Sequence, residues 1–215
     1  MLRLSLTCAM TLISALAATA AAAQASAVAE LDGLLNDIDT LSAQVVQLIV
    51  ESDGGILEES DIRMYLKKPD GFYWETLSPF PELIVTDGIT LWNYQPDLEQ
   101  VVVEDWDNSR SELAAQLLNG QTSNLAEEYL IESSVDDSGQ HHAFELTPLA
   151  SDSVYQKISI NFTLNELDLI YLNSKNGQQT VWQFQNVERN SPLEEGLFVF
   201  SPPPGIEVIE NSYTQ

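Results

Sequence analysis

Residues 64–94 carry the strongest structural signal of the chain: Met-Tyr-Leu-Lys-Lys-Pro-Asp-Gly-Phe-Tyr-Trp-Glu-Thr-Leu-Ser-Pro-Phe-Pro-Glu-Leu-Ile-Val-Thr-Asp-Gly-Ile-Thr-Leu-Trp-Asn-Tyr. Four runs rich in β-branched and aromatic residues are separated by Pro69-Asp70-Gly71, by a proline-rich bend and by Asp87-Gly88, all of which are turn signals. Seven of the chain's 18 aromatic residues lie here, with a basic spot at Lys67 and Lys68. The stretch predicts an aromatic-rich antiparallel sheet.

The first 25 residues are typical of a secretory signal peptide. A positive start at Arg3 precedes an apolar, alanine-rich run, and Ala21-Ala22-Ala23 and Ala23-Gln24-Ala25 both fit the A-x-A cleavage pattern. The alternative is a membrane anchor. We expect residues 1–25 to be cleaved and residues 26–215 to form a single exported domain. Cys8 lies within the leader, so the mature chain cannot form disulfides.

The net charge limits the classes of partner. Without Arg3 the mature chain has 7 basic and 33 acidic residues, a net charge of −26. Such a charge excludes nucleic-acid binding, which depends on neutralising phosphates, and it disfavours contact with anionic membranes. The acidity increases solubility, and it can also steer the protein toward basic partner surfaces.

Periodicity along the chain predicts a mainly β fold with a few helices. Apolar positions spaced as on one helical face predict an amphipathic helix at residues 29–41. Capping signals predict a second helix at 109–119, followed by a short helix or a turn at 124–128. Period-two runs predict roughly ten to twelve strands, which is too many for a flat sheet. The sheet should therefore curl into a partial or whole barrel, with the helices over its mouth or in its bore.

No set of residues points to catalysis, to a metal or to a cofactor. His141 and His142 are neighbours in a predicted strand, so their side chains point to opposite faces and cannot share a metal. The known nucleophile, zincin and phosphate-loop motifs are missing from the sequence. We therefore expect a binding protein and not an enzyme.

Both faces of the aromatic sheet need cover. In Tyr65-Leu66 and Phe72-Tyr73-Trp74 both strand phases are apolar, whereas a simple soluble meander has one polar face. Either the N-terminal helix covers the second face, or the sheet encloses a cavity for an apolar ligand. Arg63, Lys67 and Lys68 lie within six positions, which fits either a solvated strand end or a cationic latch that binds the carbonyls of a closing helix.

The sequence resembles the periplasmic outer-membrane lipoprotein carriers, the LolA family, over essentially the whole mature chain. The resemblance rests on four blocks: residues 66–74 (LKKPDGFYW), 85–100 (VTDGITLWNYQPDLEQ), 144–148 (FELTP) and 198–203 (FVFSPP). The family's latch is an arginine before the proline of the first block, where this chain has Lys68. The family's lid helix often begins with proline, where this chain has Leu113-Ala114-Ala115.

The resemblance implies an unclosed antiparallel half-barrel, lidded by the N-terminal helix and a mid-chain helical insertion, with a hydrophobic cavity between them. It implies a monomeric periplasmic carrier that takes triacylated lipoproteins from an inner-membrane ABC-type releasing complex to an outer-membrane receptor. The alternatives are a periplasmic lipid- or lipoprotein-sensing half-barrel and a structural β-domain with a filled core. The implied latch residues are Lys68 and Arg63, and the implied lipid-binding residues are Tyr65, Leu66, Phe72, Trp74, Trp92, Leu113 and Leu117.

Overall fold

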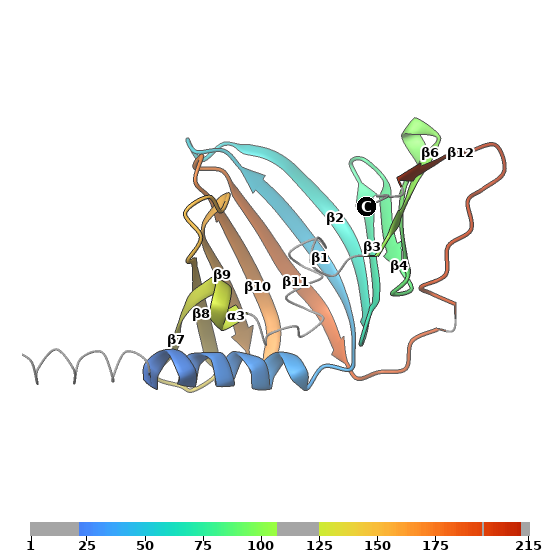
Figure 1. Ribbon diagram of the computed structural model, residues 1–215. Helices are drawn as coiled ribbons and strands as arrows, with labels where there is room; N and C mark the ends of the chain where they lie inside the picture. Colours follow the sequence, from blue (N-terminus) through green and yellow to red (C-terminus); the bar gives the residue numbers. More distant parts are fainter. Residues whose placement is uncertain (1–21, 107–124, 195, 212–215) are drawn as a thin grey trace, which may run out of the picture.

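The computed structural model describes residues 22–106, 125–194 and 196–211 (Figure 1). Their strands form one sheet in the order β12-β6-β5-β4-β3-β2-β1-β11-β10-β9-β8-β7. The twelve strands are β1 (Thr40–Val50), β2 (Ile56–Lys67), β3 (Gly71–Ser78), β4 (Glu82–Thr86), β5 (Thr90–Gln95), β6 (Gln100–Asp105), β7 (Tyr129–Val135), β8 (His141–Pro148), β9 (Tyr155–Thr163), β10 (Glu166–Ser174), β11 (Gln179–Arg189) and β12 (Glu207–Asn211). Because β7 and β12 are the two ends of the strand order, the curved sheet is unclosed, as predicted.

Hairpins between consecutive strands produce most of this strand order, and among the described strands only β1–β11 and β6–β12 pair strands that are distant in the chain. Every neighbouring pair is antiparallel except β12, which runs parallel to β6. At the β4–β5 turn Gly88 has a φ of +90°, and a Cβ there would lie 2.6 Å from the Cβ of Asp70. Only glycine satisfies both conditions, because it tolerates the left-handed region and has no side chain. The Asp87-Gly88 signal therefore fixes the register of these two strands.

Within the described residues the N-terminal helix covers residues 22–36, earlier than the predicted 29–41. Its first turns are rich in alanine, the strongest helix former. It stops before Leu41 because β1 begins at Thr40, whose backbone is paired with Lys67 of β2. Leu41 is nevertheless fully buried, since it continues the apolar face of the helix on the adjoining strand. In Figure 1 the helix runs across one end of the strands.

We call the side of the sheet on which this helix packs the inner face, and the other side the outer face. Helix residues Ala27, Leu31 and Leu35 are each 1% exposed and belong to one core cluster with inner-face residues of the sheet. Burial of each leucine stabilises the fold by about 1.5–3 kcal/mol. One end of the inner face is therefore a dry core.

A second apolar layer lies on the outer face. Val85 and Val101 are almost fully buried there, and the ring of Tyr94 packs against Phe200 at 5.4 Å between centroids. Phe200 belongs to residues 190–206, which connect β11 to β12 and which we call the C-terminal strap. Both phases of β3 are therefore apolar because the helix covers one face and the strap helps to cover the other. The prediction that the N-terminal helix would cover the second face missed the strap.

The remaining short elements match the sequence in part. Helix α3 (Leu125–Glu128) lies where the sequence predicted a short helix or a turn at 124–128, and the 3-10 helix η1 (Pro96–Leu98) follows β5. The helix predicted at 109–119 falls outside the described residues. Across the described ranges, no helix has the length and apolar character needed to cross a membrane.

Candidate functional site

The inner face of β1 and β2 changes from apolar to polar along its length. Leu41 and Val45 of β1 are buried on this face, and Gln47 follows them in the same phase. On β2, Ile62 lies opposite Val45, and Ser60 lies opposite Gln47. Since directly paired residues share a face, the apolar end near the helix gives way to a polar end farther along the strands.

A pocket of about 350 Å³ opens at this polar end. It draws on β1, β2, β3, β4 and β11 and on the β3–β4 turn, so several distant parts of the sequence meet there. The apolar and aromatic wall consists of Phe72, Trp74, Phe80, Ile84 and Trp182. The polar wall consists of Gln47, Glu58, Ser60, Thr76 and Glu82.

Hydrogen bonds and ring contacts fix both walls. The Trp182 indole nitrogen donates to Gln47 Oε1 at 2.7 Å, and Ser60 Oγ donates to a Glu58 carboxylate oxygen at 2.8 Å. Trp74 stacks on Phe72 at 6.1 Å and meets Trp182 edge-on at 5.6 Å. These contacts pre-arrange an apolar surface beside a row of hydrogen-bonding groups, which is the usual composition of a small-molecule site.

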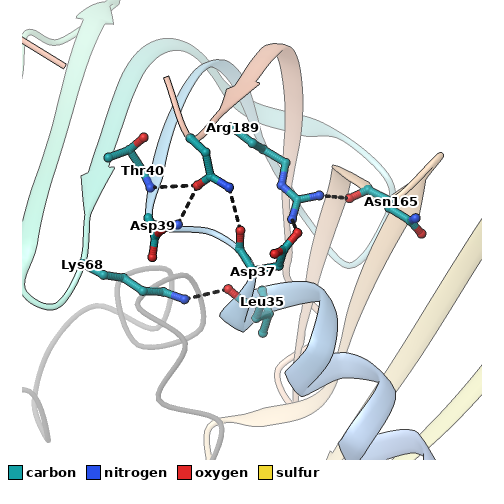
Figure 2. Close-up of polar contacts among 8 residues, drawn as sticks. Leu35, Asp37, Asp39, Thr40, Lys68, Asn165 and Arg189 are labelled. Atoms are coloured by element: carbon teal, nitrogen blue, oxygen red, sulfur yellow. Dashed lines mark hydrogen bonds and ion pairs between the residues drawn. The ribbon is translucent and has the colours of Figure 1, made fainter. Parts of the chain in front are cut away.

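Lys68 fastens the end of the N-terminal helix to β2. Its Nζ donates to the carbonyl oxygen of Leu35 at 2.7 Å (Figure 2). Its backbone N–H donates to Asp39 O at 2.9 Å. The last carbonyls of a helix lack partners within the helix and attract a cation. Burial lowers the pKa of the Lys68 amine, while the charges of Asp39 and Asp32 oppose that shift.

Two residues at the end of β11 hold the same turn from the other side (Figure 2). The Asn190 side chain accepts from Asp39 N at 2.7 Å and donates to Asp37 O at 2.8 Å. Arg189 donates to Asn165 O at 2.8 Å and pairs with Asp37 at 3.2 Å. The turn between helix and sheet is thus fixed by Lys68, which directly follows β2, and by Arg189 and Asn190 at the end of β11.

The helix is also fastened along its length. His142 Nδ1 lies 2.7 Å from a Glu30 carboxylate oxygen, which joins the helix to β8. At the start of the helix, the Gln24 amide donates to Tyr129 O at 3.1 Å and accepts from Ile131 N at 2.8 Å. Gln24 thereby makes the two backbone bonds that another strand would make at the β7 edge.

The structure brings together only part of the predicted site. Phe72 and Trp74 line the pocket. Leu66 is on the same face but is completely buried in the core under the helix end. Lys68 is in the position expected of a latch, whereas Leu113 and Leu117 fall outside the described residues.

Three predicted site residues lie on the outer face, away from the pocket. Tyr65 is paired with Tyr73 and packs against its ring, in the phase opposite to Leu66. Trp92 is paired with Val85, which is itself paired with Tyr73. Because neighbouring residues of a strand face opposite ways, neither of these two residues, which were predicted for the cavity or its mouth, lines this pocket.

Arg63 is the third. It pairs with Glu75 at 3.1 Å on the outer face, so it cannot reach the helix end that Lys68 holds.

Sequence reasoning missed Trp182 and the polar wall. Trp182 is 135 residues from Gln47 in the chain, and only the β1–β11 register makes them partners. The only sequence feature that could have indicated the face on which Trp182 lies is the alternation of apolar and polar residues along β11. In the described part of the chain, no three His, Cys, Asp or Glu side chains are grouped to hold a metal ion. His141 instead contacts Thr163 Oγ1 at 3.0 Å.

Comparisons with known proteins agree with this architecture. Residues 36–201 match the family model described as outer membrane lipoprotein carrier protein LolA. An outer-membrane lipoprotein carrier protein of Hahella chejuensis is 32% identical over 93% of this chain and 96% of its own. One from Pseudomonas aeruginosa is 33% identical over 92% and 96%.

Among solved structures, an uncharacterized conserved protein from Thermus thermophilus superposes with a TM-score of 0.56. It is 14% identical, and the match covers 85% of this chain and 98% of that one. At this identity the likeness concerns the fold alone. The family model, which spans most of the chain, and the similarity of whole sequences lead to one conclusion: the chain belongs to the LolA family of outer membrane lipoprotein carrier proteins.

Proposed function

We propose that this protein is a periplasmic carrier that shields the acyl chains of lipoproteins on their way to the outer membrane. The observation that supports this best is the pocket on the inner face, with its wall of Phe72, Trp74 and Trp182. Such a surface can receive acyl chains without any chemical step, so the proposed function is transport and not catalysis. Membership of the carrier family supports the same conclusion.

Burial of acyl chains supplies the affinity. Each methylene removed from water contributes ~0.8 kcal/mol, so an acylated protein cannot cross an aqueous compartment uncovered. A carrier must also release its cargo, so a competing interaction has to favour the empty form. In our proposal that interaction is the Lys68 latch, which holds the N-terminal helix against the sheet at Leu35.

We further propose that cargo arrives from an ATP-driven releasing complex of the inner membrane and leaves to a lipoprotein receptor of the outer membrane. Triacylated lipoproteins are the expected cargo, and the carrier is expected to act as a monomer. A lipid-sensing half-barrel or a filled-core structural domain would bind no lipoprotein for transfer. Lipoprotein release from inner-membrane vesicles therefore distinguishes them from the carrier, which should form a soluble complex with the released lipoprotein.

The latch is tested by Lys68→Leu. A hydrogen bond from a charged donor contributes about 1.5–3 kcal/mol, so its loss should shift the balance toward the loaded form by roughly tenfold or more. Lys68→Leu should bind acylated peptide more tightly than wild type, as measured by displacement of an apolar fluorescent probe, and should pass less cargo to the receptor. Lys68→Arg should retain transfer, because it keeps the cation.

Lys67→Leu is the matched control. Lys67 is the exposed neighbour of Lys68 and points to the opposite face of β2, yet its substitution changes charge and size in the same way. Should both leucine variants alter affinity and transfer equally, the effect would be one of charge alone, and Lys68 would not be a latch.

We also propose that the leader is removed in the periplasm. The contacts of Gln24 with the β7 backbone favour cleavage after Ala23, the first of the two predicted sites, because cleavage after Ala25 would remove Gln24. Intact-mass measurement of protein recovered from the periplasm should give a chain that begins at Gln24. A chain that begins at Ser26 would contradict this choice.

A further inference from the structure

The polar wall of the pocket contains more than acyl chains can use. An acyl chain has no hydrogen-bond donors and no charge, yet Glu58 and Glu82 both line the cavity. The described residues that line it include no Lys, Arg or His to neutralise these carboxylates. Two carboxylates in a cavity that otherwise suits acyl chains indicate a ligand that has a polar part next to its apolar part.

The two carboxylates lie on the same face and are held from different strands. Glu58 lies two residues before Ser60 on the inner face of β2 and accepts a hydrogen bond from the Ser60 hydroxyl. Ser60 is only 1% exposed. Glu82 is paired with Thr76 of β3, another lining residue, and accepts from the Gln95 amide at 3.0 Å. Each carboxylate has acceptor capacity beyond its one such bond, since the two oxygens together offer about four lone-pair sites.

We propose that this wall receives the polypeptide segment next to the acylated end of the cargo, and that Glu58 and Glu82 select a basic over an acidic segment there. The inference rests on the proposed carrier function and adds a charge preference to it. An amphiphile would lie with its chains on the Trp74–Trp182 side and its polar part against the carboxylates.

Electrostatics gives the preference its direction. A lysine or arginine of the cargo would meet carboxylates beside an apolar wall, where weak screening strengthens the attraction. An acidic residue would meet them as like charges, on a chain with a net charge of −25. Arrangements of this kind affect specificity more than total affinity, so the acyl chains should still supply most of the binding.

The test uses three synthetic triacylated lipopeptides that differ only in the two residues after the acylated cysteine and serine: Lys-Lys, Gln-Gln or Glu-Glu. Dissociation constants come from displacement of an apolar fluorescent probe at low salt. Wild type should prefer the Lys-Lys over the Glu-Glu peptide by about tenfold, and the preference should weaken as salt is added. In Glu58→Gln/Glu82→Gln this preference should fall to about twofold or less.

Glu59→Gln/Glu132→Gln is the matched control. It changes the net charge equally, but Glu59 and Glu132 are exposed residues in the outer phases of β2 and β7. It should keep the wild-type preference. Equal binding of all three peptides by wild type, or loss of preference in this control as well, would overturn the charge selection and leave the carrier function standing. Failure of every lipopeptide to displace the probe would overturn both.

An ammonium group next to acyl chains also occurs in phosphatidylethanolamine. A fourth arm therefore compares short-chain phosphatidylethanolamine with phosphatidylglycerol on wild type and on the Glu58→Gln/Glu82→Gln variant. We expect no preference that depends on the carboxylates, because the ethanolamine is already paired with its own phosphate. A carboxylate-dependent preference for the phospholipid, without one among the lipopeptides, would overturn the assignment to a peptide segment.

Discussion

Tyr73, on the outer face, makes the stability of the fold depend on pH in the alkaline range. Its hydroxyl donates to Glu75 at 3.1 Å. Burial, followed by the charge and hydrogen bond of Glu75, raises the pKa of the Tyr73 phenol to about 12. Between pH 10 and 12 the unfolded chain has lost this proton while the folded protein keeps it, so stability falls as the pH rises.

Tyr73→Phe should therefore lose less stability than wild type between pH 10 and 12. Urea unfolding at intervals of half a pH unit measures the slope. Some slope should remain, because burial also raises the pKa of Tyr129. If the variant and wild type lost stability equally steeply over this range, Tyr73 would not be the titrating group.

At the scale of elements, the structure shows a packing role for the C-terminal strap that the sequence did not predict. Phe200 packs on Tyr94, and Phe198 lies close to Gly71, where a Cβ would be 3.3 Å from the Phe198 ring. Phe198→Ala and Phe200→Ala should each lower the free energy of unfolding by about 1–2 kcal/mol, less than for a fully buried phenylalanine. Urea denaturation provides the measurement.

Val199 supplies the control for the strap. It lies between the two phenylalanines and is 68% exposed, so Val199→Ala should change stability by less than ~0.5 kcal/mol. If all three alanine variants were equally stable, the strap would be a passive connection between β11 and β12.

The same elements show what can be predicted from sequence. Strands were predictable because turn residues such as Asp87-Gly88 separate period-two runs. The face on which each aromatic residue lies was not predictable. Both faces of β3 are covered, so the alternate residues that include Tyr73 are as apolar as those that include Trp74. The pairing of Gln47 with Trp182 depends on the register of β1 against β11. These strands are far apart in the chain, and the local sequence pattern of each strand does not specify that register. The resemblance drew attention to Lys68, which stands before Pro69 where the family has its latch arginine, and the structure shows its contact with the helix end at Leu35.

For the whole molecule, the net charge of −25 sets the response to salt. Mutual repulsion among carboxylates destabilises the compact state, and added ions screen it. The melting temperature should rise by several degrees between low salt and physiological salt, with about 2–4 °C for each kcal/mol gained. Most of the rise should occur below about 0.3 M NaCl, where the screening length changes most. A melting temperature that does not rise, or that rises only at molar salt, would contradict this origin.

Fastening the N-terminal helix at both ends has a geometric consequence for the barrel. Gln24 attaches one end to β7, and Lys68 attaches the other to β2. Between these strands lie six interstrand steps, an arc of about 29 Å at ~4.8 Å each. Between its two attachment points, Gln24 and Leu35, the helix is a chord of only about 17 Å. Because this chord is shorter than the arc, the attached helix holds the sheet in its curved form. Cargo that requires a wider barrel must therefore first detach one end of the helix or unwind one of its turns.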